Sequence, residues 1–229
     1  MFQISGPSGK TLDFSFQYRD KVETYQELSR SLINICNTIP NGIVVFFPSY
    51  DYEARVFKHF DQNGILTKFK KSIFREPKKT SEMDSVLKNY SRSARNSGAI
   101  LFSVVGGKMS EGINFSDELG RCVVMIGLPF PNAHSPELKE KMNYLNKNVA
   151  SNAGQVHYEN LCMKAVNQSI GRAIRHKNDY ATILLLDHRY DRPNILNLLP
   201  DWIQSQVQIC DKFGPVMAKL TKFFKAAKS

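Results

Sequence analysis

The chain has 229 residues, of which 42% are hydrophobic and 11% aromatic, so it can bury a full core, and we expect one domain over residues 1–229. Lysine and arginine number 31 against 21 aspartate and glutamate, a formal net charge of +10, which favours a polyanionic partner such as nucleic acid over an acidic protein or a neutral metabolite. No apolar run approaches the roughly 18 residues of a membrane span and no signal-peptide core is present, so we expect a soluble intracellular protein without a membrane partner.

The first motif along the chain, GPSGKT at residues 6–11, looks like the end of a phosphate-binding P-loop. The complete pattern requires a glycine where Ile4 stands and a helix afterwards, whereas the following LDFSFQYRD alternates like a strand. The GGKM at residues 106–109 also fails, because Met109 replaces the hydroxyl that would hold magnesium. We therefore predict that residues 1–20 are a strand and loop leading into the domain, and that the chain has no magnesium and triphosphate cradle of its own.

The next hundred residues alternate helical and strand patterns. Apolar residues at helical spacing predict a helix from Val22 to about Ile35, and GIVVFF at residues 42–47 predicts a buried strand. A second helical pattern over residues 52–60 follows Ser49, which is a candidate N-cap. The basic segment LTKFKKSIFREPKK, residues 66–79, is predicted to be a solvated face, with a surface for DNA or a partner as the alternative.

The rest of the chain continues the alternation. It predicts a helix around residues 86–90, strands AILFSVV at 99–105, CVVMIG at 122–127 and ATILLL at 181–186, a helix over 138–145 begun by Ser135 and Pro136, and a basic helix at 213–229. Strands that alternate with helices indicate an α/β three-layer sandwich with a mainly parallel central sheet. Ligands gather at the carboxyl ends of such strands. Polar segments follow all four strands: PSYDY, GGKMSEGINF, LPFPN and DHRY.

The run QSIGRAIRH, residues 168–176, is the most informative stretch of the chain. At about 100° per residue, Gln168, Arg172 and Arg175 fall within roughly 60° of one another on a helix, and the opposite face is apolar, formed by Met163, Val166, Ile170 and Ile174. Two guanidinium forks beside an amide suit a triphosphate, and Gly171 lets a ligand or another backbone approach. Because the phosphate cradle is missing, we predict half of a site that another domain completes. A solvated basic helix face is the alternative.

Cysteine and histidine residues are scattered, with no C-x-x-C motif and no spacing that suits a metal site. No histidine stands beside a serine or cysteine nucleophile in a recognisable pattern. The sequence therefore predicts no resident metal, no covalent catalysis, and reduced structural thiols at Cys36, Cys122, Cys162 and Cys210.

Three long segments together resemble helicase motifs IV, V, Va and VI of the XPD-like iron–sulfur DNA helicases of superfamily 2. They are VVFFPSYDY, VVGGKMSEGINFSDELGRCVVMIGLPFPN and NQSIGRAIRHKNDYATILLLDHRY. Within that family, SVVGGKMSEGINF and ENLCMKAVNQSIGRAIRH look closest to the ChlR sister-chromatid-cohesion branch. Relatives in crosslink repair and telomere maintenance usually have arginine at the position of Gly107 and aspartate at that of Asn114. The resemblance extends from about Ser5 to Phe224.

The resemblance implies the second, C-terminal RecA-like domain, with a P-loop NTPase-type fold. In such enzymes ATP binds between two RecA-like domains. The magnesium cradle, the Walker A and DEAH motifs and the 4Fe–4S cluster belong to the first domain, which this sequence lacks. We therefore expect the fragment alone to be inactive and to act as an ATP hydrolase and DNA helicase only within a longer protein.

The resemblance also implies roles for single residues. Motif VI corresponds to Gln168, Arg172 and Arg175, and its arginines would reach the γ-phosphate as arginine fingers. Motif V implies nucleotide contacts by Glu111, Gly112 and Asn114. At the last position asparagine keeps the hydrogen bonding of an aspartate but not its charge, and a loop-closing turn residue is the alternative.

DNA contacts are expected from the same sheet edge, at Pro48, Ser49, Tyr50, Lys108 and Ser110. Hydroxyl, backbone N–H and ammonium groups there would bind phosphates rather than base edges, so they would follow a strand without reading its sequence. For Tyr50 we expect a packed ring, with stacking on a base as the alternative. Asp187 and Arg189, after the last strand, are expected to be structural support for motif VI.

The complete protein is thus expected to be a nuclear, 5′–3′ ATP-dependent DNA helicase of replication, repair and sister-chromatid cohesion. Its expected partners are single-stranded and forked DNA, the first RecA-like domain of the same protein, and replication-fork or cohesion proteins. The alternative is a catalytically inactive RecA-like module whose phosphate-binding face docks a protein or nucleic acid.

Overall fold

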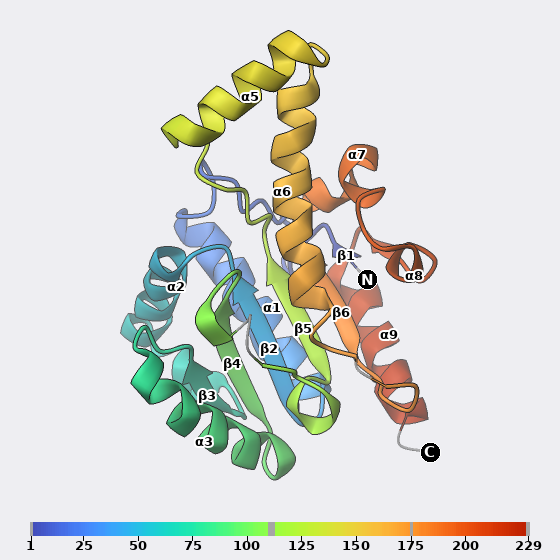
Figure 1. Ribbon diagram of the computed structural model, residues 1–229. Helices are drawn as coiled ribbons and strands as arrows, with labels where there is room; N and C mark the ends of the chain where they lie inside the picture. Colours follow the sequence, from blue (N-terminus) through green and yellow to red (C-terminus); the bar gives the residue numbers. More distant parts are fainter. Residues whose placement is uncertain (1, 110–112, 175, 228–229) are drawn as a thin grey trace.

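The computed structural model describes residues 2–109, 113–174 and 176–227 and is organised around a seven-stranded sheet (Figure 1). The strand order is β3-β4-β2-β5-β6-β1-β7, and each pair of neighbours is parallel. The strands are β1 (Phe2–Gln3), β2 (Gly42–Phe47), β3 (Ser72–Arg75), β4 (Ala99–Val104), β5 (Cys122–Ile126), β6 (Thr182–Leu186) and β7 (Ile209–Cys210).

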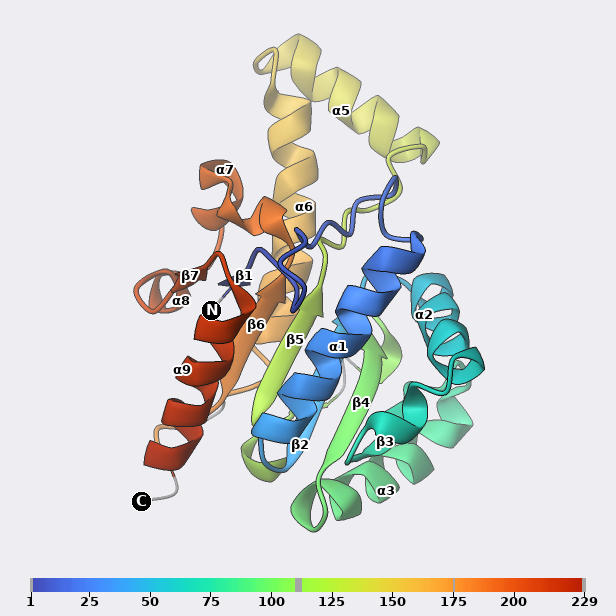
Figure 2. The same cartoon turned by 180° about the vertical axis from the view of Figure 1, so that it is seen from behind.

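Helices cover both faces of the sheet, which confirms the predicted three-layer α/β sandwich. Figure 2 shows α1 (Val22–Thr38) and α9 (Phe213–Ala226) on one face, with α2 (Tyr50–Gln62) beside them. The opposite face carries α3 (Met83–Arg95) and α6 (Ala153–Ile170). The remaining helices are α5 (Pro136–Asn148), the short α7 (Pro193–Leu196) and α8 (Asp201–Gln204), and the 3-10 turns η1 (Leu66–Lys68), η2 (Thr80–Glu82), η3 (Asp117–Leu119) and η4 (His188–Asp191). Among the residues that the structure describes, no helix has both the length and the apolar character needed to cross a membrane.

The central strands are buried on both faces because their side chains alternate between two hydrophobic clusters. In β2, Ile43, Val45 and Phe47 join the cluster beneath α1, α2 and α9. Val44 and Phe46 join the cluster beneath α3 and α6. Every residue of β2, β4 and β5 is buried. Apolar runs therefore mark these strands, as predicted, with Ser103 in β4 as a buried polar member.

The four predicted strands are confirmed to within one residue at either end, and so are two helix starts. Ser49 is the N-cap of α2, where its hydroxyl accepts a hydrogen bond from the Tyr52 amide at 3.2 Å. Ser135 and Pro136 begin α5, although the Ser135 side chain forms no capping bond there. No residue of α5 is buried, so this helix projects with the start of α6 beyond the sheet (Figure 1).

Two predictions about local structure are wrong. The LDFSFQYRD segment is not a strand, because residues 16–20 form a turn and Thr11 makes only an isolated bridge to Ser5. Its backbone is bound by non-local groups, among them the Ile4 carbonyl that accepts from the Leu12 amide at 2.7 Å. The segment 66–79 is not merely a solvated face, because it contains the edge strand β3. Only four residues pair in that strand, too few to produce a clear apolar alternation.

Candidate functional site

The carboxyl ends of β2, β4, β5 and β6 meet at one edge of the sheet, because these strands are parallel neighbours. The segments that follow them hold most of the predicted site residues. The end of α6 with Arg172 also contacts this region, since the Phe115 amide donates to the Arg172 carbonyl at 3.0 Å. The predicted site residues that the structure describes thus lie in neighbouring loops, although they come from separate parts of the sequence.

In the segment after β2, Pro48, Ser49 and Tyr50 are all half-buried. The Ser49 oxygen already accepts the capping bond of α2. The Tyr50 hydroxyl donates to the Glu76 carboxylate at 2.5 Å, and burial, followed by this hydrogen bond, raises the pKa of Tyr50 to about 12. Tyr50 is therefore a neutral, anchored side chain in this state.

In the segment after β4, Gly106 has a φ of +68°, a left-handed conformation that glycine adopts without steric cost. Lys108 is exposed, and its ammonium donates to the Thr80 hydroxyl at 2.8 Å. Met109 is buried and its amide donates to Glu76 at 3.1 Å. Of the predicted positions here, Ser110, Glu111 and Gly112 lie outside the described residues.

Sequence reasoning missed Glu76, a carboxylate with 7% exposure at the end of β3. It accepts hydrogen bonds from the segments after β2 and β4, at Tyr50 and Met109. A signal was present, because Glu76 is the one acidic residue in the basic run LTKFKKSIFREPKK. The signal is weak, because a single acid in a basic run is equally expected in solvent or in an ion pair.

After β6, Asp187 is fully buried and accepts from the Arg189 guanidinium at 2.8 and 2.7 Å and from the Phe14 amide at 3.1 Å. Burial acts to lower the pKa of Arg189, but the hydrogen bonds to Asp187 outweigh it and hold that pKa above its ordinary value. The pair thus binds the N-terminal segment. In the described part of the chain it forms no hydrogen bond to Gln168 or Arg172, so its support of motif VI stays a prediction.

The predicted helix face of Gln168, Arg172 and Arg175 needs a correction, because α6 ends at Ile170. Gly171 is the C-cap, and the Arg172 amide bonds to the Ser169 carbonyl at 3.2 Å, as in a tightened last turn. Arg172 therefore lies in a turn after the helix, while Gln168 is exposed on its last turn.

The apolar side of this stretch also differs from the expectation. Met163, Val166 and Ile170 are buried as predicted, but Ile174 is 37% exposed, because it lies beyond the helix end. Arg175 lies outside the described residues.

Arg172 is half-buried, and within the described residues its guanidinium makes no hydrogen bond or ion pair. Asn114 is exposed in the loop that leads to Phe115. The Phe115–Arg172 backbone bond thus holds the loop of Asn114 and the turn after α6 together. The guanidinium of Arg172 is positive and partly exposed to solvent, so it can bind an anion that another domain supplies.

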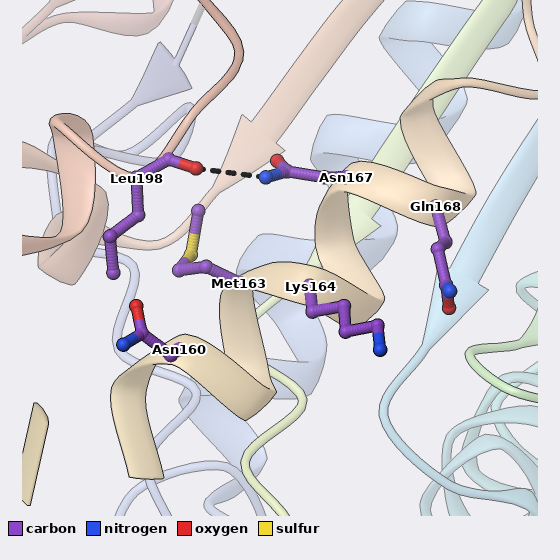
Figure 3. Close-up of a pocket in the computed structure, with 6 residues that line it drawn as sticks. All are labelled: Asn160, Met163, Lys164, Asn167, Gln168 and Leu198. Atoms are coloured by element: carbon purple, nitrogen blue, oxygen red, sulfur yellow. Dashed lines mark hydrogen bonds between the residues drawn. The ribbon is translucent and has the colours of Figure 1, made fainter. Parts of the chain in front are cut away.

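A hollow of about 470 Å³ opens beside Gln168 on the surface of α6 (Figure 3). The Asn167 amide donates to the Leu198 carbonyl at 2.8 Å and so connects α6 to the segment after α7. Lys164 and Gln168 extend away from Leu198 in Figure 3. The lining comprises Asn160, Met163, Lys164, Asn167, Gln168 and Leu198.

Asp117, His176 and Asp179 have potential metal-ligand atoms within 4.8 Å of one another. However, the Asp179 carboxylate accepts from the Arg121 guanidinium at 2.8 Å and from the Asp117 amide at 3.2 Å. His176 lies 3.1 Å from the Asp117 carboxylate. These hydrogen bonds and ion pairs connect the loop after Phe115 to the loop that leads into β6.

Comparison with known proteins shows a match over most of the chain. Residues 32–206 match the model of the helicase C-terminal domain. The chain is 53% identical to ATP-dependent DNA helicase DDX11 of Danio rerio over 234 aligned residues, which cover 96% of this chain and 26% of the relative. It is 41% identical to ATP-dependent DNA helicase chl1 of Schizosaccharomyces pombe, over 97% of this chain and 28% of that protein. The chain therefore spans about a quarter of the length of these relatives.

Solved structures show the same fold. An XPD helicase structure aligns with a TM-score of 0.67 and 21% identity, over 91% of this chain and 34% of that one. The S. tokodaii Xpd4 structure aligns with a TM-score of 0.64 and 20% identity, over 91% of this chain and 37% of that one. At these identities the likeness concerns the arrangement of the sheet and its helices.

Proposed function

We propose that this chain, which belongs to the helicase C-terminal domain family, is the second motor domain of an ATP-dependent DNA helicase. The match to a helicase named DDX11, at 53% identity over 96% of the chain, supports this proposal most strongly. The geometry agrees with it, because the loops of motifs IV and V and the motif VI turn lie at one edge of a RecA-like sheet. ATP hydrolysis and unwinding then belong to a longer protein.

In this proposal ATP lies between this domain and a first RecA-like domain that provides the magnesium and triphosphate cradle. Gln168, Arg172 and Arg175 act from this side on the γ-phosphate, where arginine stabilises the charge that develops during phosphoryl transfer. The position of Arg172 after the helix end supports this role, since a side chain on a turn can project toward a facing domain. Glu111, Gly112 and Asn114 contact the nucleotide.

The 4Fe–4S cluster of the resembling helicases does not fit the residues of this chain. Its four cysteines are buried and lie in both core clusters, with Cys36, Cys122 and Cys210 on one face of the sheet and Cys162 on the other. Burial raises the pKa of Cys36, Cys122 and Cys162 to about 12. Cysteines that lie on opposite faces of the sheet cannot converge on one cluster, so we assign the cluster to the first half of the protein.

Single-stranded DNA passes along the loops after β2 and β4 in this proposal, against Pro48, Ser49, Tyr50, Lys108 and Ser110. The exposed Lys108 ammonium and the backbone amides suit phosphates, and the net charge of +10 favours a polyanion. We propose that the complete protein moves 5′–3′ on single-stranded and forked DNA. We further propose that it is a nuclear protein of replication, repair and sister-chromatid cohesion, and that it works with replication-fork or cohesion proteins.

The full-length protein and the 229-residue chain, assayed side by side, test the proposal. We expect DNA-stimulated ATP hydrolysis and unwinding of a duplex with a 5′ single-stranded tail from the full-length protein, and negligible hydrolysis from the isolated chain. Loss of hydrolysis in full-length Arg172→Ala would place that arginine at the reaction. A full-length protein that binds DNA but never hydrolyses ATP would instead identify a RecA-like binding module.

A further inference from the structure

Glu76 lies where β3 ends at the edge of the sheet. Its amide donates to the Phe102 carbonyl at 2.8 Å, which continues the ladder between β3 and β4 by one more bond. The backbone of Glu76 is therefore fixed, although the residue is formally part of the loop. The side chain is 7% exposed, so its carboxylate depends on protein groups for its hydrogen bonds.

Each carboxylate oxygen of Glu76 accepts two hydrogen bonds. The Oε1 atom accepts from the Tyr50 hydroxyl at 2.5 Å and from the Met109 amide at 3.1 Å. The Oε2 atom accepts from the Ser103 hydroxyl at 2.5 Å and from the Val104 amide at 3.0 Å. Three segments of the chain thus meet at one side chain: the start of α2, the end of β4 and the loop after β4.

All four donors are neutral, and no cation among the described residues forms an ion pair with Glu76. A buried carboxylate is stable only when such donors replace its water, and hydrogen bonds to a charged acceptor are stronger than those between neutral groups. The donors are consequently held at fixed positions around the carboxylate. A neutral amide at this position would turn one oxygen into a donor that faces other donors.

Two further contacts fasten the loop after β4 to the same segment. Gly107 lies against the carboxylate so closely that a Cβ atom there would be 2.3 Å from Oε1 of Glu76. Beyond it, the Lys108 ammonium donates to Thr80, four residues after Glu76. The short stretch after β3 therefore orients both loops to which the proposed function assigns DNA contacts.

We propose that Glu76 is a positioning residue. Its carboxylate holds the segment 48–50, at the start of α2, and the loop 105–109 in the relative arrangement that binds the phosphates of single-stranded DNA. This inference rests on the proposed function. Glu76 itself is too buried to contact DNA and repels phosphate by its charge, so it acts through Tyr50 and the backbone that carries Lys108. Loss of the carboxylate should weaken DNA binding and leave the ATP-hydrolysing groups intact.

The test compares Glu76→Gln with Glu27→Gln in the full-length protein. Glu27 is the control, because it is 3% exposed and its carboxylate also accepts from a backbone amide, that of Ser8 at 3.0 Å. Unlike Glu76 it pairs with a cation, the Arg30 guanidinium at 3.1 Å, and it lies on α1 away from these loops. The measurements are the oligo-dT concentration for half-maximal ATPase, the ATPase rate at saturating oligo-dT, and the melting temperature.

For Glu76→Gln we expect the half-maximal DNA concentration to rise about tenfold, which corresponds to the loss of one charge-assisted hydrogen bond. The rate at saturating DNA should stay within about twofold of wild type. Amide hydrogen exchange at Val104 and Met109 should accelerate, while exchange within β2 should not. Glu27→Gln should leave the DNA dependence unchanged.

Tyr50→Phe provides a second variant that removes only one donor and keeps the ring. We expect its half-maximal DNA concentration to rise about threefold, since a single neutral donor is lost. An unchanged value in both variants, or a change in Glu76→Gln no larger than in Glu27→Gln, overturns the positioning role. A wild-type protein whose ATPase ignores DNA contradicts the proposed function itself, so the two failures are distinguishable.

Discussion

Asp187→Asn should destabilise the protein strongly, because Asp187 is the buried partner of Arg189. The Asp187 side chain is 0% exposed and that of Arg189 12%. Two guanidinium bonds at 2.8 and 2.7 Å and backbone bonds from Phe14 at 3.1 Å and Arg189 at 2.9 Å all end on this carboxylate. The neutral amide cannot accept all of them, and the arginine loses its counter-charge.

The size of the effect follows from the burial. Removing one partner of a buried ion pair costs about 3–5 kcal/mol, because the other charge stays buried without compensation. Asparagine keeps one acceptor oxygen, so we expect the lower end, about 3 kcal/mol. In a domain of this size each 1 kcal/mol lowers the melting temperature by roughly 2–4 °C, which gives a decrease of about 6–12 °C.

Thermal and urea unfolding of Asp187→Asn, Arg189→Met and the double variant measure this effect. The double variant should lose less stability than the sum of the two single losses, because it leaves no charge unpaired. Asp51→Asn is the control, since the Asp51 side chain in its surface pair with Arg55 is 79% exposed and should cost under about 0.5 kcal/mol. An Asp187→Asn loss as small as that of the control would refute the reasoning.

Three further results are expected. Full-length Arg172→Lys should keep its melting temperature, since Arg172 makes no ion pair among the described residues, but lose about 10³-fold or more in DNA-stimulated ATPase; turnover near wild type would remove Arg172 from the reaction. The isolated chain, with its charge of +10, should bind oligo-dT more than tenfold more weakly at 200 mM than at 50 mM salt in an anisotropy titration, and equal affinities would contradict a phosphate-directed surface. Burial raises the pKa of Cys122 to about 12, whereas the unfolded chain has an ordinary value near 9. Between these pH values the unfolded chain releases the thiol proton and the folded chain keeps it, so this contribution to stability is complete below about pH 9 and is lost as pH rises to 12. A urea midpoint that stays constant over this window would contradict the expectation.

The pattern of neighbouring residues was sufficient to predict the central sheet and to identify the family. The strands β2, β4, β5 and β6 are covered on both faces, so each one appears in the sequence as a largely apolar run, with Ser103 in β4 and Thr182 in β6 as its polar members. Ser49 could be recognised as a cap because capping joins atoms only three residues apart. The parallel arrangement then required that the polar segments after these strands meet at one edge.

Features that depend on distant partners could not be predicted. The end of α6 was placed too late although Gly171, its C-cap, is a local stop signal. The turn after it could not be predicted, because the bond from the Phe115 amide to the Arg172 carbonyl joins segments 57 positions apart in the chain. The edge strand β3 exists because β4 provides its pairing partner, and its own four residues carry no distinctive period. The pattern of neighbouring residues in the sequence carries no information about such long-range contacts.

Glu76 shows most clearly why the tertiary structure was needed. Composition marks it only as one acid among lysines and arginines, and local chemistry predicts solvent or an ion pair for it. In the folded chain it accepts from Tyr50, 26 positions earlier, and from Met109, 33 positions later. Apolar periodicity is written into neighbouring residues and can be read from them, whereas the environment of a buried charge is assembled only when remote segments pack together.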